Sequence, residues 1–165
     1  SKMILSATFV SMRNYNEMKS TNDFTITLVS DESPRTVFNA IRNVRQWWSG
    51  YYSEKLEGDT DNLNDEFTFL AGGGEHFSRQ RLTEVVPDKK IVWLVTESKL
   101  NFLEQKDEWT GTRVIFDISQ SNGKTYLTFT HQGLHPEVEC YEACAPAWTQ
   151  YLQNRLRPMI HATTL

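Results

Sequence analysis

Residues 24–50 read FTITLVSDESPRTVFNAIRNVRQWWSG, and this stretch decides the class of fold. Apolar and polar side chains alternate from Phe24 to Val29, which is the period of a half-buried strand. Ser33 and Pro34 then mark the start of a helix, because serine can cap the helix and proline lacks an N–H that the first turn would leave unpaired. Apolar residues at helical spacing follow as far as Trp48, and Gly50 then ends the helix. The stretch therefore predicts a strand followed by a helix.

Residues 67–132 carry several strand patterns separated by turns. Strands are predicted at 67–69, 76–86, 91–96, 112–119 and 124–132. Turn signals stand between them at Gly72–Gly74, Pro87-Asp88 and Asn122-Gly123, and Asn-Gly between two alternating runs is the strongest short-range hairpin signal in the chain. The polar residues 51–66 indicate a long loop with at most a short irregular strand. This part of the chain therefore predicts antiparallel strands.

The last element is a helix expected at about residues 137–160. Its apolar residues recur at helical spacing, namely Tyr141, Cys144, Trp148, Leu152, Leu156 and Met159. Pro146 removes one backbone hydrogen bond inside this helix, so a kink or a restart is expected there. A strand, a helix, about five antiparallel strands and a long terminal helix together predict the α+β class.

Size and composition restrict the kind of protein. The 165 residues have the length of one domain, and the periodic pattern begins only near Phe24, so residues 1–22 are interpreted as a leader and 23–165 as the domain. The 17 basic and 21 acidic residues are spread along the chain, and this lack of a basic stripe argues against a nucleic-acid partner. No apolar run is long enough for a membrane span, and no secretory signal is present, which predicts a cytoplasmic protein.

Cys140 and Cys144 are too few for a disulfide framework, and we interpret them as reduced thiols one helical turn apart. With His131 and His135 they form the one set of metal-ligand types close in sequence, and two histidines with two thiolates would suit tetrahedral zinc. Packing on the helix face that also carries Trp148 explains the cysteines better. We therefore expect no metal and no cofactor.

The strand patterns also predict which polar side chains face inward. On the strand at 76–86, an inward Leu82 leaves Arg79 and Arg81 in solvent, which avoids burying two unpaired guanidinium groups. The inner face of the sheet then holds four polar side chains among aromatic ones, namely His76, Ser78, Gln80 and His131. Fraying strand ends would leave such groups simply solvated or bonded to backbone. A ligand pocket is mostly apolar with a few convergent polar groups, so the pattern also fits a site.

Three longer stretches carry a family resemblance. Residues 24–50, HFSRQRLTEVVPDKKIVWLVTES (76–98) and EWTGTRVIFDIS (108–119) with THQGL (130–134) together resemble bacterial members of the START-like (SRPBCC) superfamily, homologues of the activator of the heat-shock-protein-90 ATPase. The resemblance covers residues 23 to about 160. It implies a helix-grip fold, in which a curved antiparallel sheet of six or seven strands wraps a long C-terminal helix and leaves a cavity between them. It does not imply one activity, because relatives include lipid carriers, aromatase/cyclases, hormone receptors and cochaperone domains.

Residues from the sheet and the terminal helix are expected to line that cavity. The candidate ligand-binding residues are Trp48, Phe67, Phe69, His76, Ser78, Gln80, Phe116, Phe129, His131, Tyr141, Trp148 and Leu152. Trp47 has to point away from Trp48, and the pattern leaves the orientation of Trp47 and Trp93 open. No catalytic residue is assigned, because the chain has no nucleophile triad, phosphate-binding loop or metalloprotease motif.

Three functions stay open. We favour non-enzymatic binding of a small apolar or amphipathic ligand. The second is a cochaperone-like module acting on a heat-shock ATPase, although the eukaryotic cochaperone joins this domain type to another chaperone-binding domain that these 165 residues do not encode. The third is a cavity enzyme of cyclase or hydrolase type, which would need His76, His131 or Glu84 as general acid or base.

Overall fold

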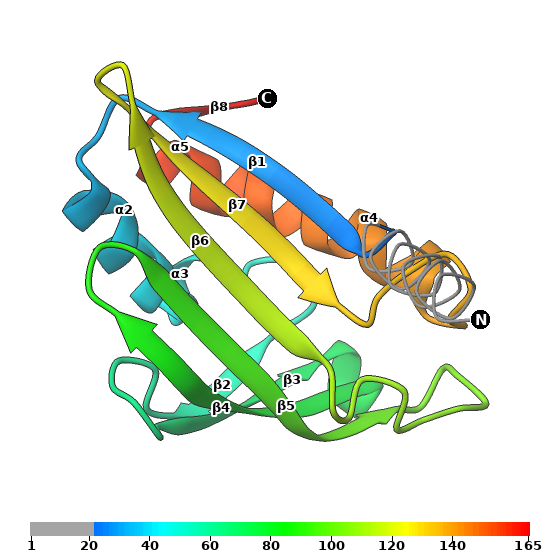
Figure 1. The fold of residues 1–165 in the computed structure, drawn as a ribbon. Coiled ribbons are helices and arrows are strands. Elements are labelled where there is room, and N and C mark those ends of the chain that lie inside the picture. The colour runs from blue at the N-terminus through cyan, green and yellow to red at the C-terminus, as the bar shows by residue number, and fades with distance from the viewer. Residues whose placement is uncertain (1–21) are drawn as a thin grey trace, which may run out of the picture.

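The computed structural model describes residues 22–165, and the predicted leader falls almost wholly outside them. Eight strands form one antiparallel sheet in the order β2-β3-β4-β5-β6-β7-β1-β8. Their bounds are β1 Phe24–Ser30, β2 Lys55–Gly58, β3 Glu66–Ala71, β4 His76–Val86, β5 Lys90–Leu100, β6 Arg113–Ser121, β7 Lys124–Gln132 and β8 Ala162–Thr164. The sheet curves around the C-terminal helix, which lies along its inner face (Figure 1). The α+β helix-grip prediction is confirmed, with one or two strands more than expected.

The predicted first helix is divided into two. Helix α2 spans Pro34–Arg42, and the Oγ of Ser33 accepts a hydrogen bond from the backbone N–H of Thr36 at 3.1 Å, as a serine cap should. The chain leaves helical geometry at Asn43, and α3 then spans Val44–Trp47. This break turns the second segment, so that both neighbouring tryptophans, Trp47 and Trp48, enter the core.

The C-terminal helix starts later than expected and is irregular at another place. Helix α4 spans Tyr141–Tyr151 and runs through Pro146 without a restart. The regular pattern changes instead at Leu152–Leu156, which form a π-helical turn, before the short helix α5 at Arg157–Met159. Pro158 follows this turn and cannot donate a backbone hydrogen bond. The π-helical turn therefore lies where proline already interrupts the regular series of helical hydrogen bonds.

Strands β2 and β8 are short and lie at the two edges of the sheet. Strand β2 falls where the sequence allows at most a short irregular strand, and β8 is not predicted. Strand β2 pairs with β3 and ends at Gly58, whose φ is +105°. A Cβ there would lie 2.3 Å from the carbonyl oxygen of Glu66, so this position requires glycine. Strand β8 pairs with β1, and the Oγ of Ser30 donates to the carbonyl of Ile160 at 2.5 Å beside that pair. Three or four residues are too few to show a period.

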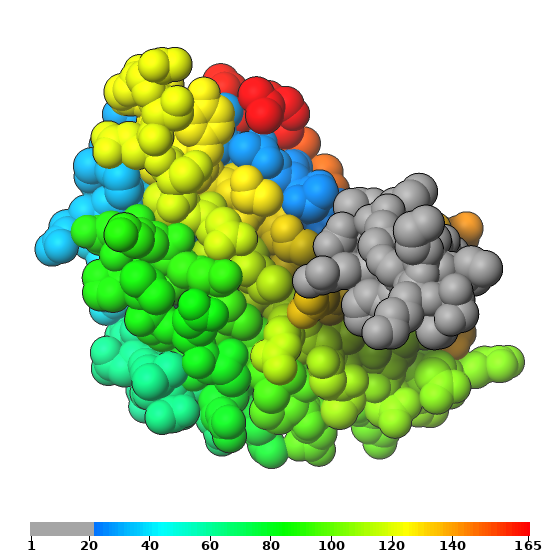
Figure 2. Space-filling model, viewed as in Figure 1, coloured from blue at the N-terminus to red at the C-terminus, as the bar shows by residue number. Residues whose placement is uncertain are grey.

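The predicted strand faces are confirmed. Ser78, Gln80 and Leu82 of β4 are buried, whereas Arg79 and Arg81 are exposed. The outer face carries polar pairs: the Arg79 guanidinium lies 2.9 Å from the Glu97 carboxylate, and the hydroxyls of Thr27 and Thr128 lie 3.1 Å apart across β1 and β7. It also carries partly exposed apolar side chains, among them Leu94 and Ile115. Figure 2 shows this outer face, on which side chains of β1, β5, β6 and β7 cover the sheet.

All five tryptophans lie in the core between sheet and helices. Trp47 stacks on Trp93 with ring centroids 6.1 Å apart and donates its indole N–H to the carbonyl of Ile41 at 3.0 Å. Trp48, Trp148 and Trp109 continue the cluster toward one end of the sheet. The orientation of Trp47 and Trp93, which the pattern leaves open, is therefore inward for both.

Candidate functional site

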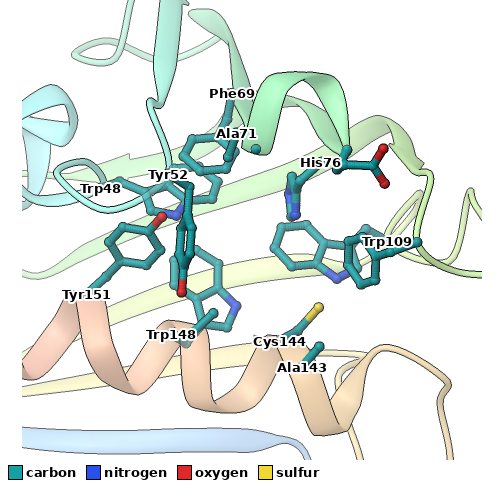
Figure 3. A pocket seen from close by; sticks show the side chains of 14 residues that line it. Trp48, Tyr52, Phe69, Ala71, His76, Trp109, Ala143, Cys144, Trp148 and Tyr151 are labelled. Carbon is teal, nitrogen blue, oxygen red and sulfur yellow. The ribbon is translucent and has the colours of Figure 1, made fainter.

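A cavity of about 310 Å³ opens beside this cluster, between the β3–β4 end of the sheet and helix α4. Seven of its lining side chains are aromatic and four lining residues are alanine or glycine. It is lined by Trp48, Tyr52, Phe69, Ala71, Gly72, Glu75, His76, Phe102, Trp109, Ala143, Cys144, Ala147, Trp148 and Tyr151. Figure 3 shows Trp48, Tyr52 and Tyr151 on one side, His76 and Trp109 on the other, and Trp148 and Cys144 rising from the helix. The volume lies at the lower end of the range of small-molecule pockets.

The walls of the cavity are flat aromatic faces. Trp48 lies almost parallel to Phe69, with ring centroids 3.7 Å apart and an interplanar angle of 7°. Trp109 and Trp148 are also parallel, at 5.8 Å and 9°. Trp48 and Trp148 connect the two pairs at 5.0 Å. The stacked rings form flat aromatic walls beside the cavity.

A buried hydrogen-bond chain holds the ring of Trp148. Its indole N–H donates to Nδ1 of His131 at 3.0 Å, and Nε2 of His131 lies 2.9 Å from the hydroxyl of Thr112. The Thr112 hydroxyl donates to the carbonyl of Trp109 at 2.6 Å, so it accepts from His131, which places the histidine proton on Nε2. Burial, with a smaller effect of His76, lowers the pKa of His131 to about 3. The chain is therefore neutral and fully bonded.

The loop between β5 and β6 carries Trp109 and is clamped to the start of α4. The carboxylate of Glu108 accepts the backbone N–H groups of Glu139 and Cys140 at 3.0 and 2.7 Å. In return the carboxylate of Glu139 accepts the N–H groups of Glu104 and Gln105, both at 3.0 Å. These backbone hydrogen bonds lower the pKa of Glu139. The reciprocal clamp fixes Trp109 against the helix.

Two ring nitrogens of side chains that line the cavity have no hydrogen-bond partner within residues 22–165. His76 contacts the rings of Phe69 and Trp109 edge to face, with centroids 5.1 and 4.6 Å apart. The Nε2 of His76 is enclosed, and within residues 22–165 nothing hydrogen-bonds to it. The same holds for the indole Nε1 of Trp109, whose side chain is 4% exposed. Burial lowers the pKa of His76 to about 3, so this ring is neutral at neutral pH.

The mouth of the cavity combines exposed aromatic rings with carboxylates. Tyr52 and Phe102 are 48% and 46% exposed. The hydroxyl of Tyr151 donates to the carboxylate of Glu54 at 2.7 Å. Burial and this carboxylate raise the pKa of Tyr151. Burial also acts to raise the pKa of Glu54. The hydrogen bonds that Glu54 accepts from Tyr151 and from backbone N–H groups outweigh the burial effect, so the pKa of Glu54 is lowered. Glu75 is the one carboxylate among the lining residues, and none of them is a lysine or arginine.

The structure brings four of the twelve candidate residues to the cavity, namely Trp48, Phe69, His76 and Trp148. Seven others are buried in the core behind its walls: Phe67, Ser78, Gln80, Phe116, Phe129, His131 and Leu152. Tyr141, the first residue of α4, is partly buried against the core and does not line the cavity. Binding by any of these residues remains a prediction.

Sequence patterns miss most of the remaining lining residues. Trp109 lies in a segment without a period, and its one signal was a tryptophan within a polar loop. Tyr52 lies in residues 51–66, for which the sequence predicts a long loop with at most a short irregular strand. Ala143 and Ala147 give no signal in the sequence, because small residues on a helix carry no reactive group, although one turn of helix places them on one face.

Two further expectations concern the cysteines and metal. The structure pairs Cys140 with Cys144 as a disulfide, where the sequence predicts reduced thiols. The start of the helix brings their Cα atoms to 5.5 Å, which is within the range that a disulfide spans. Within residues 22–165, no three His, Cys, Asp or Glu side chains gather as a metal site would require, and His135 does not join the cysteines.

Comparison with protein families identifies the group. The model for the Activator of Hsp90 ATPase homolog 1-like proteins matches residues 31–160. The chain belongs to this family. The matched range begins just before helix α2 and ends with the C-terminal helix, so it includes every residue that lines the cavity. A search of the curated proteins finds no match.

Solved structures of bacterial proteins share the fold of this Hsp90-activator-like chain. The Aha1 dimer from Colwellia psychrerythraea is 17% identical, with a TM-score of 0.63 over 84% of this chain and 96% of that one. A protein from Chromobacterium violaceum is 18% identical, with a TM-score of 0.64 over 85% and 97%. A Rhizobium loti protein is 21% identical, with a TM-score of 0.61 over 79% and 91%. At these identities the likeness concerns the fold alone. No helix within residues 22–165 is long and apolar enough to cross a membrane.

Proposed function

We propose that this protein binds a small apolar or amphipathic molecule in the cavity between the sheet and helix α4, in the cytoplasm and without catalysing a reaction. One observation supports this best: a cavity of about 310 Å³ stays open in a core that elsewhere fills its space with tryptophan and phenylalanine. That volume equals roughly ten water molecules. When an apolar molecule replaces the water inside an apolar cavity, the free-energy change favours binding.

The cavity-enzyme alternative has less support. Of its three acid–base candidates, Glu84 is exposed on the outer face of β4, and His131 is fully bonded behind Trp148. His76 does line the cavity, but a pKa of about 3 makes it a weak base and leaves it without a proton to donate at neutral pH.

The cochaperone alternative would require an apolar docking surface. On the outer face of the sheet, Leu94 and Ile115 are only partly exposed, and Leu94 lies between Arg81 and Arg113 of the neighbouring strands. Exposed aromatic rings gather instead at the cavity mouth, at Tyr51, Tyr52 and Phe102. We therefore expect less than twofold stimulation of a heat-shock ATPase by this protein alone at micromolar concentration. A several-fold stimulation would favour the cochaperone function.

The proposed function is tested by filling the cavity from helix α4. Ala147 lines the cavity, so Ala147→Phe should occupy the space and weaken binding of the neutral fluorescent probe N-phenyl-1-naphthylamine at least tenfold. Asn154→Phe is the matched control, because Asn154 is exposed on the same C-terminal segment. Equal binding by wild type and Ala147→Phe, or no binding by the wild type, would contradict the proposal. Thermal unfolding of both variants verifies that they are folded.

A further inference from the structure

Three aromatic rings in the cavity lining are almost closed to solvent. Trp48, Trp148 and Tyr151 are each at most 3% exposed, although all three border the open volume. Tyr52 borders the same volume and is 48% exposed. Figure 3 shows its ring standing among the other three. A molecule in the open volume therefore contacts Tyr52 but reaches little of the three buried rings.

The side chain of Tyr52 crosses the cavity mouth from the sheet to helix α4. Its backbone carbonyl accepts the N–H of Gly72, the residue after β3, at 2.8 Å. Its hydroxyl, at the far end of the ring, donates to Oε1 of Gln150 on α4 at 3.2 Å. Figure 3 shows the ring spanning the space between Ala71 and the helix. Tyr52 is therefore a wall of the cavity that is attached at both ends.

The two attachments differ in strength. At the backbone end, the N–H of Tyr52 also donates to the Glu54 carboxylate at 2.8 Å, so hydrogen bonds hold both of its backbone polar groups. Within residues 22–165, the hydroxyl end makes one hydrogen bond, and that bond is exposed, so water can replace either partner and its net contribution is modest. Exposed side chains change rotamer in picoseconds to nanoseconds. The ring can therefore swing away from Gln150 while the backbone keeps its place.

Opening this side chain would change what surrounds the buried rings. In water, uncovering Trp48 and Trp148 exposes apolar surface and is unfavourable. An apolar ligand that takes the place of the Tyr52 ring covers that surface again and buries its own apolar area as well. Tyr151 cannot move in the same way, because it is buried and its hydroxyl donates to Glu54 at 2.7 Å. The closed position is therefore favoured in the free protein and the open position in the complex.

We propose that the side chain of Tyr52 is a lid: its hydrogen bond to Gln150 holds it closed in the free protein, and an apolar ligand displaces it to reach Trp48 and Trp148. The inference rests on the proposed function and adds how the ligand gains its contact surface. Because the closing hydrogen bond is broken in the complex, this bond opposes binding.

Breaking the closing bond without removing the ring tests the lid. Tyr52→Phe removes the hydroxyl, and Gln150→Met removes its acceptor at nearly constant size. Each change should lower the Kd of N-phenyl-1-naphthylamine roughly two- to fivefold and raise its association rate in stopped-flow fluorescence, because the closed state competes less. Both changes break the same bond, so the double variant should bind no more tightly than the tighter single variant.

Tyr126→Phe is the matched control, because it removes the hydroxyl of a partly exposed tyrosine on the outer face of β7, and it should leave the Kd and the association rate unchanged. Unchanged binding in Tyr52→Phe and Gln150→Met, additive gains in the double variant, or an equal gain in Tyr126→Phe would overturn the lid while leaving the proposed function intact. Absence of probe binding by the wild type and by every variant would overturn both. Thermal unfolding verifies that each variant is folded.

A second measurement needs no variant. In the free wild type, nuclear Overhauser cross-peaks should connect the ring protons of Tyr52 with the side chain of Gln150, and they should disappear when N-phenyl-1-naphthylamine is added. The ring of Tyr151 is the internal reference, since its hydroxyl is held by Glu54 in both states. Cross-peaks between Tyr52 and Gln150 that persist in the complex would contradict the displacement of the lid.

Discussion

Lowering the pH from 7 to 5 should destabilise this protein through two buried histidines. Burial lowers the pKa values of His76 and His131 from 6.5 to about 3. Between these values the unfolded chain binds protons that the folded chain does not, so the free energy of unfolding falls as the pH falls. The stabilisation is fully present above pH 6.5 and is lost progressively as the pH falls toward the folded-state pKa values.

The expected size follows from the two pKa values. At pH 5 an unfolded histidine is almost fully protonated, whereas a folded one with a pKa of about 3 stays neutral. Each histidine therefore removes about 2 kcal/mol between pH 7 and 5, and the pair removes about 4 kcal/mol. Ordinary carboxyl groups titrate mainly below this window, so the histidines dominate it.

Urea unfolding followed by tryptophan fluorescence at pH 7, 6 and 5 measures this loss. His76→Phe separates the two groups: the substitution keeps an aromatic ring against Phe69 and Trp109, and His76 makes no hydrogen bond within residues 22–165 that the change would break. The variant should lose about 2 kcal/mol less than the wild type over the same range. A stability that does not change from pH 7 to 5, or equal pH dependence in both proteins, would refute the burial argument.

Three substitutions test the packing around the cavity, each by denaturant titration. Trp148→Ala should lower the free energy of unfolding by about 3–5 kcal/mol, because the ring contacts Trp48, Trp109 and Phe129 and only part of it meets the cavity. A loss under about 1 kcal/mol would contradict that packing. Gln80→Leu should cost no more than about 1.5 kcal/mol, because it removes the hydrogen bond that Nε2 of Gln80 donates to Oγ of Ser78 but also removes the buried Oε1 that has no partner within residues 22–165. A larger loss would contradict this balance. Gly58→Ala should lower the free energy of unfolding by more than about 1 kcal/mol, because Gly58 has a positive φ and the new Cβ would collide with the backbone of Glu66. A variant as stable as the wild type would show that β2 can shift.

Local sequence rules correctly predict the parts of the fold in which the properties of single residues determine where a helix starts or which way a strand faces. Ser33 and Pro34 start α2 at the predicted residue, since capping needs only the next turn. Alternation correctly orients Ser78 and Gln80 inward because an inward Arg79 would have been costly. The break at Asn43 escapes such rules, since the apolar spacing continues across it and only the packing of the two tryptophans separates α2 from α3.

The candidate site is predicted less well than the fold, for a physical reason. Strand periodicity says which side chains face inward, but an inward side chain meets either a cavity or another side chain. His131 illustrates the difference: it is inward as predicted, yet Trp148 and Thr112 occupy both its nitrogens, and it stays behind the wall. His76, on the same face, lies where the sheet ends and the helix is lined with alanine, so it meets open space.

The cavity exists because small residues face each other across the core. Ala143 and Ala147 lie one turn apart on α4, and Ala71 and Gly72 stand at the end of β3, so neither side fills the space. A leucine or phenylalanine at any of these positions would make the core continuous, and the neighbouring aromatic rings would still pack as they do. The open space therefore depends on residues that carry no reactive or charged group of their own.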